Sequence, residues 1–137
     1  MEDLAVSDGI SVDSDPNVNF WDKGKKNLPN LPINAEKSIQ NYLRQTIAKY
    51  SKAIKVKTDQ PKAFYCRGTA KYQLEDYRGA VDDFTKAIEC KPDFSNAYVN
   101  RAWAYFMLGS KAEAIQDLHR AQELGYPVVP EAFNLFA

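Results

Sequence analysis

The sequence predicts an all-α protein in which antiparallel helix pairs stack one after another as a solenoid. Residues 61–94 align on residues 95–128 without a gap and with eight identities, so the second copy follows directly on the first. Small residues recur in both copies at places where large core residues are expected. Turn residues interrupt the apolar pattern in the middle of each copy, and this combination is typical of stacked helical repeats.

The first predicted element is one long helix over residues 35–57, which Asn34 can cap. Its apolar residues follow helical spacing: Ile39, Tyr42, Leu43, Ile47, Tyr50 and Ile54. Five residues in or just after its second half are identical to the equivalent residues of the first complete copy: Lys52, Ala53, Ile54, Lys57 and Asp59. The helix therefore resembles the second half of a degenerate repeat, whose first half cannot be helical across the proline-rich residues 28–32.

Each complete copy predicts two helices, over 62–74 and 77–90 in the first and over 96–108 and 111–124 in the second. Glu75-Asp76 and Gly109-Ser110 supply the turns, Pro61 suits a helix start and Pro92 a helix end. Gly68 and Ala102 are expected where the paired helices cross, because small side chains let the backbones approach. Enlarging either one should destabilise the fold.

The two ends of the chain differ from the repeats. Residues 125–137 are expected to form a capping segment, with a short helix over 130–136 that closes the last repeat; the alternative is a frayed end. Residues 1–33 form a predicted extension, partly extended or disordered, that is acidic first (−5 over residues 1–16) and then basic and proline-rich. Within it, residues 18–33 either dock back onto the helical domain 34–137 or bind another molecule.

The repeat resembles the tetratricopeptide repeat (TPR), a family of right-handed solenoids. The residues that carry this resemblance are Phe64, Gly68, Ala80, Phe84, Ala87 and Pro92 in the first copy, and Tyr98, Ala102, Tyr105, Ala114, Leu118 and Ala121 in the second. Arg67 and Arg101 depart from the pattern, which has a leucine there. The resemblance implies a TPR-like solenoid of about two and a half repeats.

The family resemblance also implies that a partner binds on the concave face, formed by the first helix of each pair. Helical spacing then predicts this set of groove residues: Lys62, Tyr65, Cys66, Thr69, Tyr72, Gln73, Asn96, Val99, Asn100, Trp103, Phe106 and Met107. Their aromatic and methionine side chains suit an extended peptide or an amphipathic helix. The alternative is that some of them pack against neighbouring repeats or the ends of the chain.

Two ion pairs within the repeats are predicted as well. The spacing in sequence between Arg67 and Asp83 is the same as that between Arg101 and Asp117. An antiparallel helix pair can bring each arginine to its aspartate. The corresponding positions of the partial repeat hold Ile33 and Lys49, so both members of the pair are absent there together.

Composition and motifs disfavour catalysis and cofactors. There is one histidine (His119, expected on the surface), the two cysteines lie far apart in the sequence, and no glycine-rich phosphate loop occurs. We therefore expect no metal, no cofactor and no enzyme. The net charge of zero argues for neither a nucleic acid nor a membrane as the overall partner. Asn100 alone matches the clamp with which some TPR proteins hold chaperone C-termini, so that partner is not expected.

The predicted function is that of a protein-interaction adaptor or scaffold, in the cytoplasm or another reducing compartment because only two cysteines occur. Two alternatives remain open. One is a basic helix that docks on an anionic membrane or nucleic acid, based on Arg44, Lys49, Lys52, Lys55 and Lys57. The other is self-association into a homo-oligomer.

Overall fold

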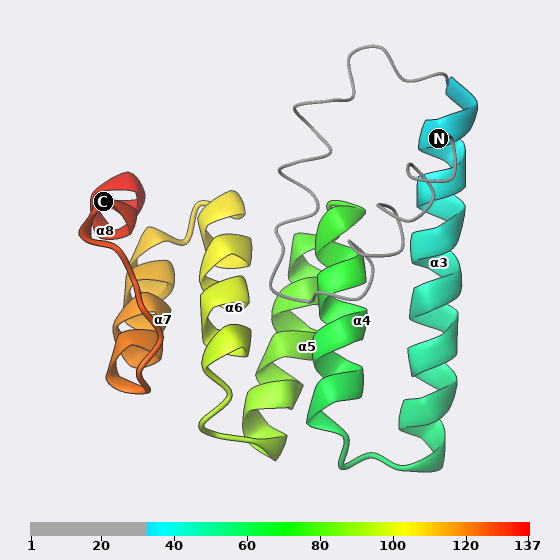
Figure 1. Ribbon diagram of the computed structural model, residues 1–137, viewed down its shortest axis with the longest axis horizontal. Coiled ribbons are helices and arrows are strands. Elements are labelled where there is room, and N and C mark those ends of the chain that lie inside the picture. The colour runs from blue at the N-terminus through cyan, green and yellow to red at the C-terminus, as the bar shows by residue number, and fades with distance from the viewer. Residues whose placement is uncertain (1–32) are drawn as a thin grey trace, which may run out of the picture. The chain divides into compact units, whose positions relative to one another are not determined.

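The computed structural model describes residues 33–137, where the chain forms α-helices and no strands (Figure 1). In chain order these are α3 (Ile33–Val56), α4 (Pro61–Gln73), α5 (Tyr77–Cys90), α6 (Ser95–Met107), α7 (Lys111–Glu123) and α8 (Pro130–Phe136). The chain divides into two compact units, Met1–Ser38 and Ile39–Ala137, so only the first turns of α3 belong to the first unit. The predicted docking of residues 18–33 falls almost entirely outside the described residues and stays a prediction.

The helices begin and end close to the expected residues. The four helices of the two complete repeats start and stop within one residue of the ranges that the sequence predicts, and α3 within two. The short helix expected at 130–136 is α8. Apolar spacing and turn residues were therefore sufficient to place the helices.

Local chemistry explains the helix ends. Pro61 and Pro130 lie in the first turns of α4 and α8, where a missing N–H group costs nothing. Asp76 caps α5, since its Oδ1 accepts a hydrogen bond from the Gly79 N–H at 3.0 Å. After α6 the chain turns through Gly109 with φ of +82°, whereas Glu75 takes the equivalent place after α4 with φ of +66°. A left-handed conformation at Glu75 is a local cost that glycine avoids in the second repeat.

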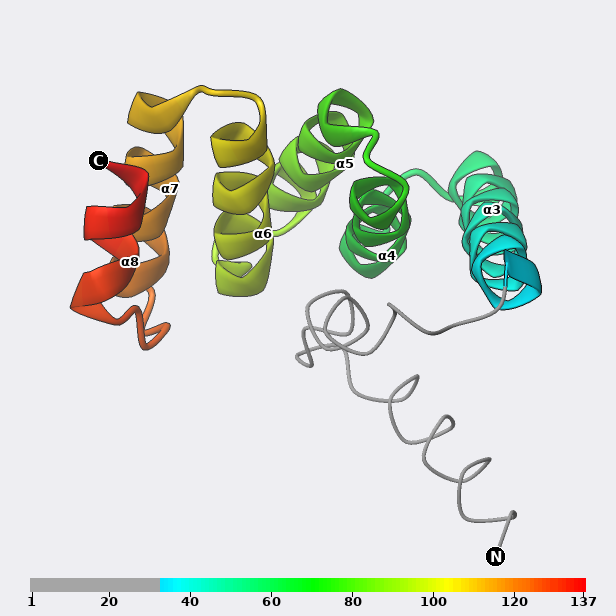
Figure 2. The ribbon, with the colours of Figure 1, turned by 90° about the horizontal axis from the view of Figure 1, so that it is seen from above.

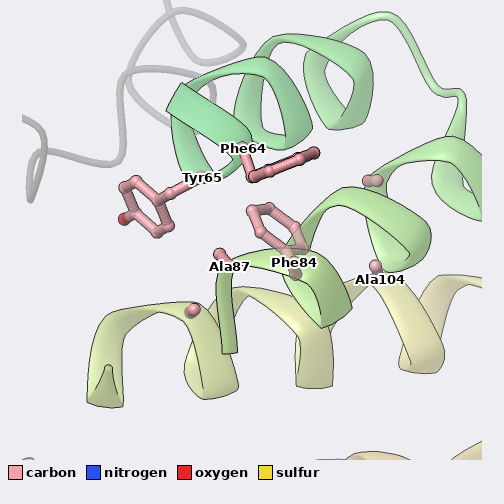
Figure 3. Packing of buried hydrophobic residues seen from close by; sticks show 7 residues of the cluster. Phe64, Tyr65, Phe84, Ala87 and Ala104 are labelled. Carbon is pink, nitrogen blue, oxygen red and sulfur yellow. The ribbon is translucent and has the colours of Figure 1, made fainter. Parts of the chain in front are cut away.

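The first core cluster joins α4, α5 and α6 (Figure 3). Phe84 of α5 is fully buried, with Ala80 and Ala87 one turn away on the same face, also fully buried. Phe64 and Tyr65 of α4 cover one side of Phe84, and buried alanines of α6 lie on the other side. The small residues are thus where two helix backbones approach the same aromatic ring.

A second cluster holds α6, α7 and α8 together. Ala102, Ala114 and Leu118 repeat the small–small–large arrangement of the first cluster, and Phe136 of α8 completes it. Phe136 has no exposed surface at all. The cap expected at the C-terminal end is therefore built around this single side chain.

The helix α8 is in register with the beginnings of α4 and α6 when one extra residue is allowed in the loop before it. Ala132-Phe133 then corresponds to Ala63-Phe64 and to Ala97-Tyr98, and Phe136 stands where the other repeats have Arg67 and Arg101. The gapless comparison of the two complete copies did not reveal this relation. In its position and sequence, α8 is the start of a further first helix.

The helix α3 meets α4 through a side-chain hydrogen bond that α5 and α6 also form, although the α3 and α4 backbones approach each other far less closely than those of α5 and α6. The Nη1 atom of Arg67 donates to Ser51 Oγ of α3 at 3.1 Å, and the Nη1 atom of Arg101 donates to Thr85 Oγ1 of α5, also at 3.1 Å. Ser51 and Thr85 occupy equivalent positions of successive repeats, as the two arginines do. From Ile39 onward, α3 therefore occupies the place of a second helix, and the succession α3, α4, α5, α6, α7 can be followed in Figure 2.

Within residues 33–137, none of the helices is long and apolar enough to span a bilayer.

Candidate protein-binding face

The predicted groove residues lie on α4 and α6, but Tyr65 belongs to the core. Only 7% of Tyr65 is exposed, and its ring lies 5.9 Å from that of Phe84 and 4.9 Å from that of Phe94. Its hydroxyl oxygen accepts a hydrogen bond from Asn100 Nδ2 at 2.9 Å, which links α4 to α6. Burial raises the pKa of Tyr65 to about 12, although this hydrogen bond works in the opposite direction.

Trp103 and Phe106 pack against the chain's own C-terminal helix, α8. The ring of Phe136 lies edge-on to Trp103 at 5.0 Å and is stacked on Phe106 at 4.8 Å. Both α6 rings are consequently only part-exposed. This is the alternative raised by the sequence, in which some predicted groove residues pack against an end of the chain.

The other predicted residues remain accessible to differing extents. Lys62 and Met107 are exposed, and 42% of Met107 is open to solvent. Half-buried positions are Cys66, Thr69, Tyr72, Gln73, Asn96, Val99 and Asn100. The ring of Tyr72 lies edge-on to that of Tyr77 at 5.2 Å, and burial raises the pKa of Tyr72 to about 12.

Sequence reasoning missed Leu135 of α8 as a candidate for this face. Leu135 corresponds to Cys66 and Asn100 once the extra loop residue is allowed for, and 55% of it is exposed. A search for a third copy with a one-residue insertion would have found it. The accessible residues that we group as the first-helix face are Lys62, Cys66, Thr69, Tyr72, Gln73, Asn96, Val99, Asn100, Met107 and Leu135.

Polarity changes along the first-helix face. On α4 the exposed residue is the charged Lys62, and the half-buried Thr69 and Gln73 lie there together with Cys66 and Tyr72. Its α6 and α8 residues include the exposed apolar side chains Met107 and Leu135, and the half-buried Val99. A ligand on this face would meet polar groups at one end and apolar groups at the other.

Both ion pairs are present in the structure, and both are bidentate. Arg67 donates from Nε and Nη2 to Asp83 at 2.8 and 2.7 Å, and Arg101 donates from the same atoms to Asp117 at 2.7 Å each. The aspartate side chains are only 3% and 7% exposed. Each pair joins the first helix of a repeat to the second.

The two pairs differ in their surroundings. The ammonium group of Lys71 lies 3.2 Å from Asp83 Oδ2, whereas Arg101 lies between the rings of Tyr98 and Tyr105 at 5.6 and 5.7 Å. Hydrogen bonding to Asp83 raises the pKa of Arg67. For Arg101, burial works to lower the pKa, but the interactions with Asp117 outweigh it and the net direction is upward. The pairs are structural connections between the two helices of a repeat.

His119 is exposed, with its ring 4.6 Å from that of Phe133. No group of three histidine, cysteine, aspartate or glutamate side chains in the described part of the chain is placed to hold a metal ion.

The stacked helix pairs, with small residues at each crossing, place the chain in the class of helical-repeat proteins. Two family models, both described as tetratricopeptide repeat, match residues 61–94 and 84–116. The two matches together cover residues 61–116 and, with the solved structures below, support a tetratricopeptide-repeat protein with a few repeats. A search of curated protein sequences found no match.

Solved structures with the same fold include the first TPR of Spaghetti (RPAP3) bound to the HSP90 peptide SRMEEVD. It is 28% identical, covers 71% of this chain and 76% of its own, and has a TM-score of 0.64. The TPR2B domain of yeast Sti1, in a complex with pHsp70, is 23% identical over 74% of this chain and 85% of its own, with a TM-score of 0.62. MamA is 18% identical, covers 77% and 64%, and has a TM-score of 0.58. The last two are similar in fold alone.

Proposed function

We propose that this protein is a non-catalytic adaptor that binds a peptide or helical segment of another protein on its first-helix face. The observation that carries the proposal is that Met107 and Leu135 are exposed and Val99 is half-buried on this face. Exposed methionine and leucine side chains on a rigid helical scaffold are typical of surfaces that receive apolar side chains of a partner. The similar TPR of Spaghetti has an HSP90 peptide bound, which supports a peptide as the kind of ligand.

The bound segment would have an apolar end and a polar end. Its apolar side chains would contact Met107 and Leu135 near α8, and its polar part would lie along Lys62, Thr69 and Gln73 of α4. Trp103 and Phe106 contribute indirectly, because they hold Phe136 and thereby fix α8 against α6. We expect no chemical step: the described acids are paired in structural contacts or scattered, and the adaptor acts by holding its partner.

The free cysteines Cys66 and Cys90 favour a reducing compartment as the place where the adaptor works.

Affinity capture from a cell extract tests the proposal. The bait proteins would be the wild type and Met107→Asp, with Gln122→Asp as the control, because Gln122 is also exposed but lies on α7. We expect the same partners with wild type and control, and their loss with Met107→Asp. Partners that all survive Met107→Asp would contradict the proposal.

The runner-up function is docking of α3 on an anionic surface. Arg44, Lys49, Lys52 and Lys55 are exposed on this helix, and no acid occurs between residues 37 and 58. Binding to anionic vesicles or to heparin that falls steeply with added salt would favour it. Partner capture that is insensitive to salt but sensitive to Met107 would favour the adaptor.

A further inference from the structure

One face of the second helices α5 and α7 is buried, and the equivalent face of α3 is not. In α5 this face consists of Ala80, Asp83, Phe84 and Ala87, and in α7 of Ala114, Asp117, Leu118 and Ala121, all of them buried. The equivalent residues of α3, one repeat before α5, are Thr46, Lys49, Tyr50 and Ala53. Lys49 is exposed and the other three are half-buried. Among the described residues, α3 has no first helix beside it as α4 lies beside α5.

This face of α3 keeps the size pattern of the interface but reverses its charge. The large aromatic Tyr50 stands at the place of Phe84, between the smaller Thr46 and Ala53, which take the places of Ala80 and Ala87. In contrast, Lys49 stands at the place of Asp83, the acid that receives Arg67 from α4. The Lys49 ammonium group lies over the Tyr50 ring, 5.3 Å from its centre, and the Tyr50 side chain also hydrogen-bonds to Cys66 of α4.

The outer side of α3 is also more basic than that of the other second helices, because Lys55 replaces an acid there. Lys86 is 3.5 Å from Glu89 in α5, and Arg120 is 3.0 Å from Glu123 in α7. The equivalent residues of α3 are Lys52 and Lys55, two cations. Within residues 33–137 no ion pair neutralises Lys49, Lys52 or Lys55. Lys49 stands at the interface position, so an incoming helix on α3 would need a carboxylate where α4 and α6 carry Arg67 and Arg101.

We infer that the face of α3 formed by Thr46, Lys49, Tyr50 and Ala53 is the docking site for an acidic first helix from another protein. The partner helix would have an Asp or Glu directly followed by a Gly or Ala. In this chain the equivalent pairs are Arg67-Gly68 and Arg101-Ala102. The carboxylate would meet Lys49 as Arg67 meets Asp83, and the small residue would meet Tyr50 as Gly68 meets Phe84, where the backbones approach closely. The partner would then extend the array by one first helix.

The placement of α3 on α4 supports this inference. The hydrogen bond from Arg67 to Ser51 reproduces the one from Arg101 to Thr85, so the Ser51 side of α3 faces α4 as the Thr85 side of α5 faces α6, although α3 and α4 are less closely packed. The side of α3 that would receive its own first helix is thereby fixed. Partner binding at this site is independent of the first-helix face of the proposed adaptor function.

The test uses the full chain and two synthetic peptides with the sequence of α4, Pro61–Gln73, capped at both ends and carrying Cys66→Ser. One peptide keeps Arg67 and the other carries Arg67→Glu. Titration into the isotopically labelled chain, followed by nuclear magnetic resonance, detects even millimolar binding and identifies the residues whose signals move. We expect the Arg67→Glu peptide to shift signals at residues 46–53 and to bind roughly 10-fold more tightly than the Arg67 peptide, as a charge-assisted contact allows.

Two variants of the full chain complete the experiment. Lys49→Asp should reverse the preference, so that the Arg67 peptide binds more tightly. Lys55→Asp changes the net charge equally but lies at an exposed position equivalent to Glu89, and it should keep the preference for the acidic peptide. Equal binding of both peptides, signals that move elsewhere, or no binding at millimolar concentration would overturn the inference. A dimer in sedimentation that Lys49→Asp dissociates would also overturn it, because the occupant would then be a second copy of the chain.

Discussion

The crossing of α4 and α5 allows a quantitative test at Gly68. A Cβ atom added to Gly68 would lie 2.9 Å from Cε1 and 3.1 Å from Cδ1 of Phe84, and 3.0 Å from Cβ of Asp83. Phe84 is fully buried, so its ring has no free space into which to move. Overpacking of this kind typically costs about 1–3 kcal/mol.

Helix propensity acts in the opposite direction at this position. Gly68 lies inside α4, where replacing glycine by alanine gains about 1 kcal/mol when nothing else changes. The two effects together give Gly68→Ala an expected net loss of about 1 kcal/mol in the free energy of unfolding. For a domain of this size, this lowers the melting temperature by roughly 4–8 °C.

The second repeat suggests the control, because Ala102 there lies in a cluster with Leu118, which replaces Phe84. In a Phe84→Leu background the side chain that limits the space at residue 68 is smaller. Gly68→Ala should then become neutral or stabilising by up to about 1 kcal/mol. Urea unfolding of the four proteins of this double-mutant cycle measures the change. If Gly68→Ala stabilises the chain to the same extent with Phe84 present, the close approach of α4 and α5 is not what requires a glycine.

Three further outcomes follow from the contacts described above. Asp83→Ala should destabilise the chain by about 3–5 kcal/mol, because it leaves Arg67 without its buried partner, and adding Arg67→Met should recover part of the loss. If urea unfolding shows that the losses of the two single variants simply add in the double variant, the two residues are not coupled. Phe136→Ala should lower the free energy of unfolding by up to about 5 kcal/mol and release α8 from α6. A changed indole N–H resonance of Trp103 would report this release, and an unchanged resonance would mean that α8 stays in place without its buried ring. Burial raises the pKa of Tyr65 from 10.0 to about 12, so the hydroxyl group loses its proton at a lower pH in the unfolded chain than in the folded one. The free energy of unfolding should therefore fall by about 3 kcal/mol in total as the pH rises from about 10 to about 12. Tyr65→Phe should reduce this alkaline loss, and an identical pH profile for wild type and variant would exclude Tyr65 as a cause.

The sequence by itself determined the helices and their pairing. A strict sequence period with small side chains at fixed places can be satisfied only if each copy forms the same pair of helices with the same crossing. Gly68 and Ala102 could therefore be assigned to the crossings. The shared arginine–aspartate spacing also indicated which side chains meet, because an antiparallel pair has few ways to bring residues at that spacing into contact.

The accessible binding surface was decided by the tertiary structure. Helical spacing gives the side of a helix on which Tyr65 and Trp103 lie, but not what packs against that side. The ring of Tyr65 is enclosed between Phe84 and Phe94, and Trp103 is covered by Phe136, which lies two helices later in the chain. A pattern of single residues does not contain such contacts between elements.

The same reason explains why two features of the sequence acquired a meaning only in the assembled helices. The relation of α8 to the first helices was hidden by one extra loop residue, which leaves the packing of Phe136 intact but shifts the sequence out of register. The charge reversal at Lys49 is visible in the sequence, yet its meaning depends on the Arg67–Ser51 contact that fixes how α3 is oriented. Periodicity determines local structure through the backbone, whereas exposure is a property of all the elements that surround a side chain.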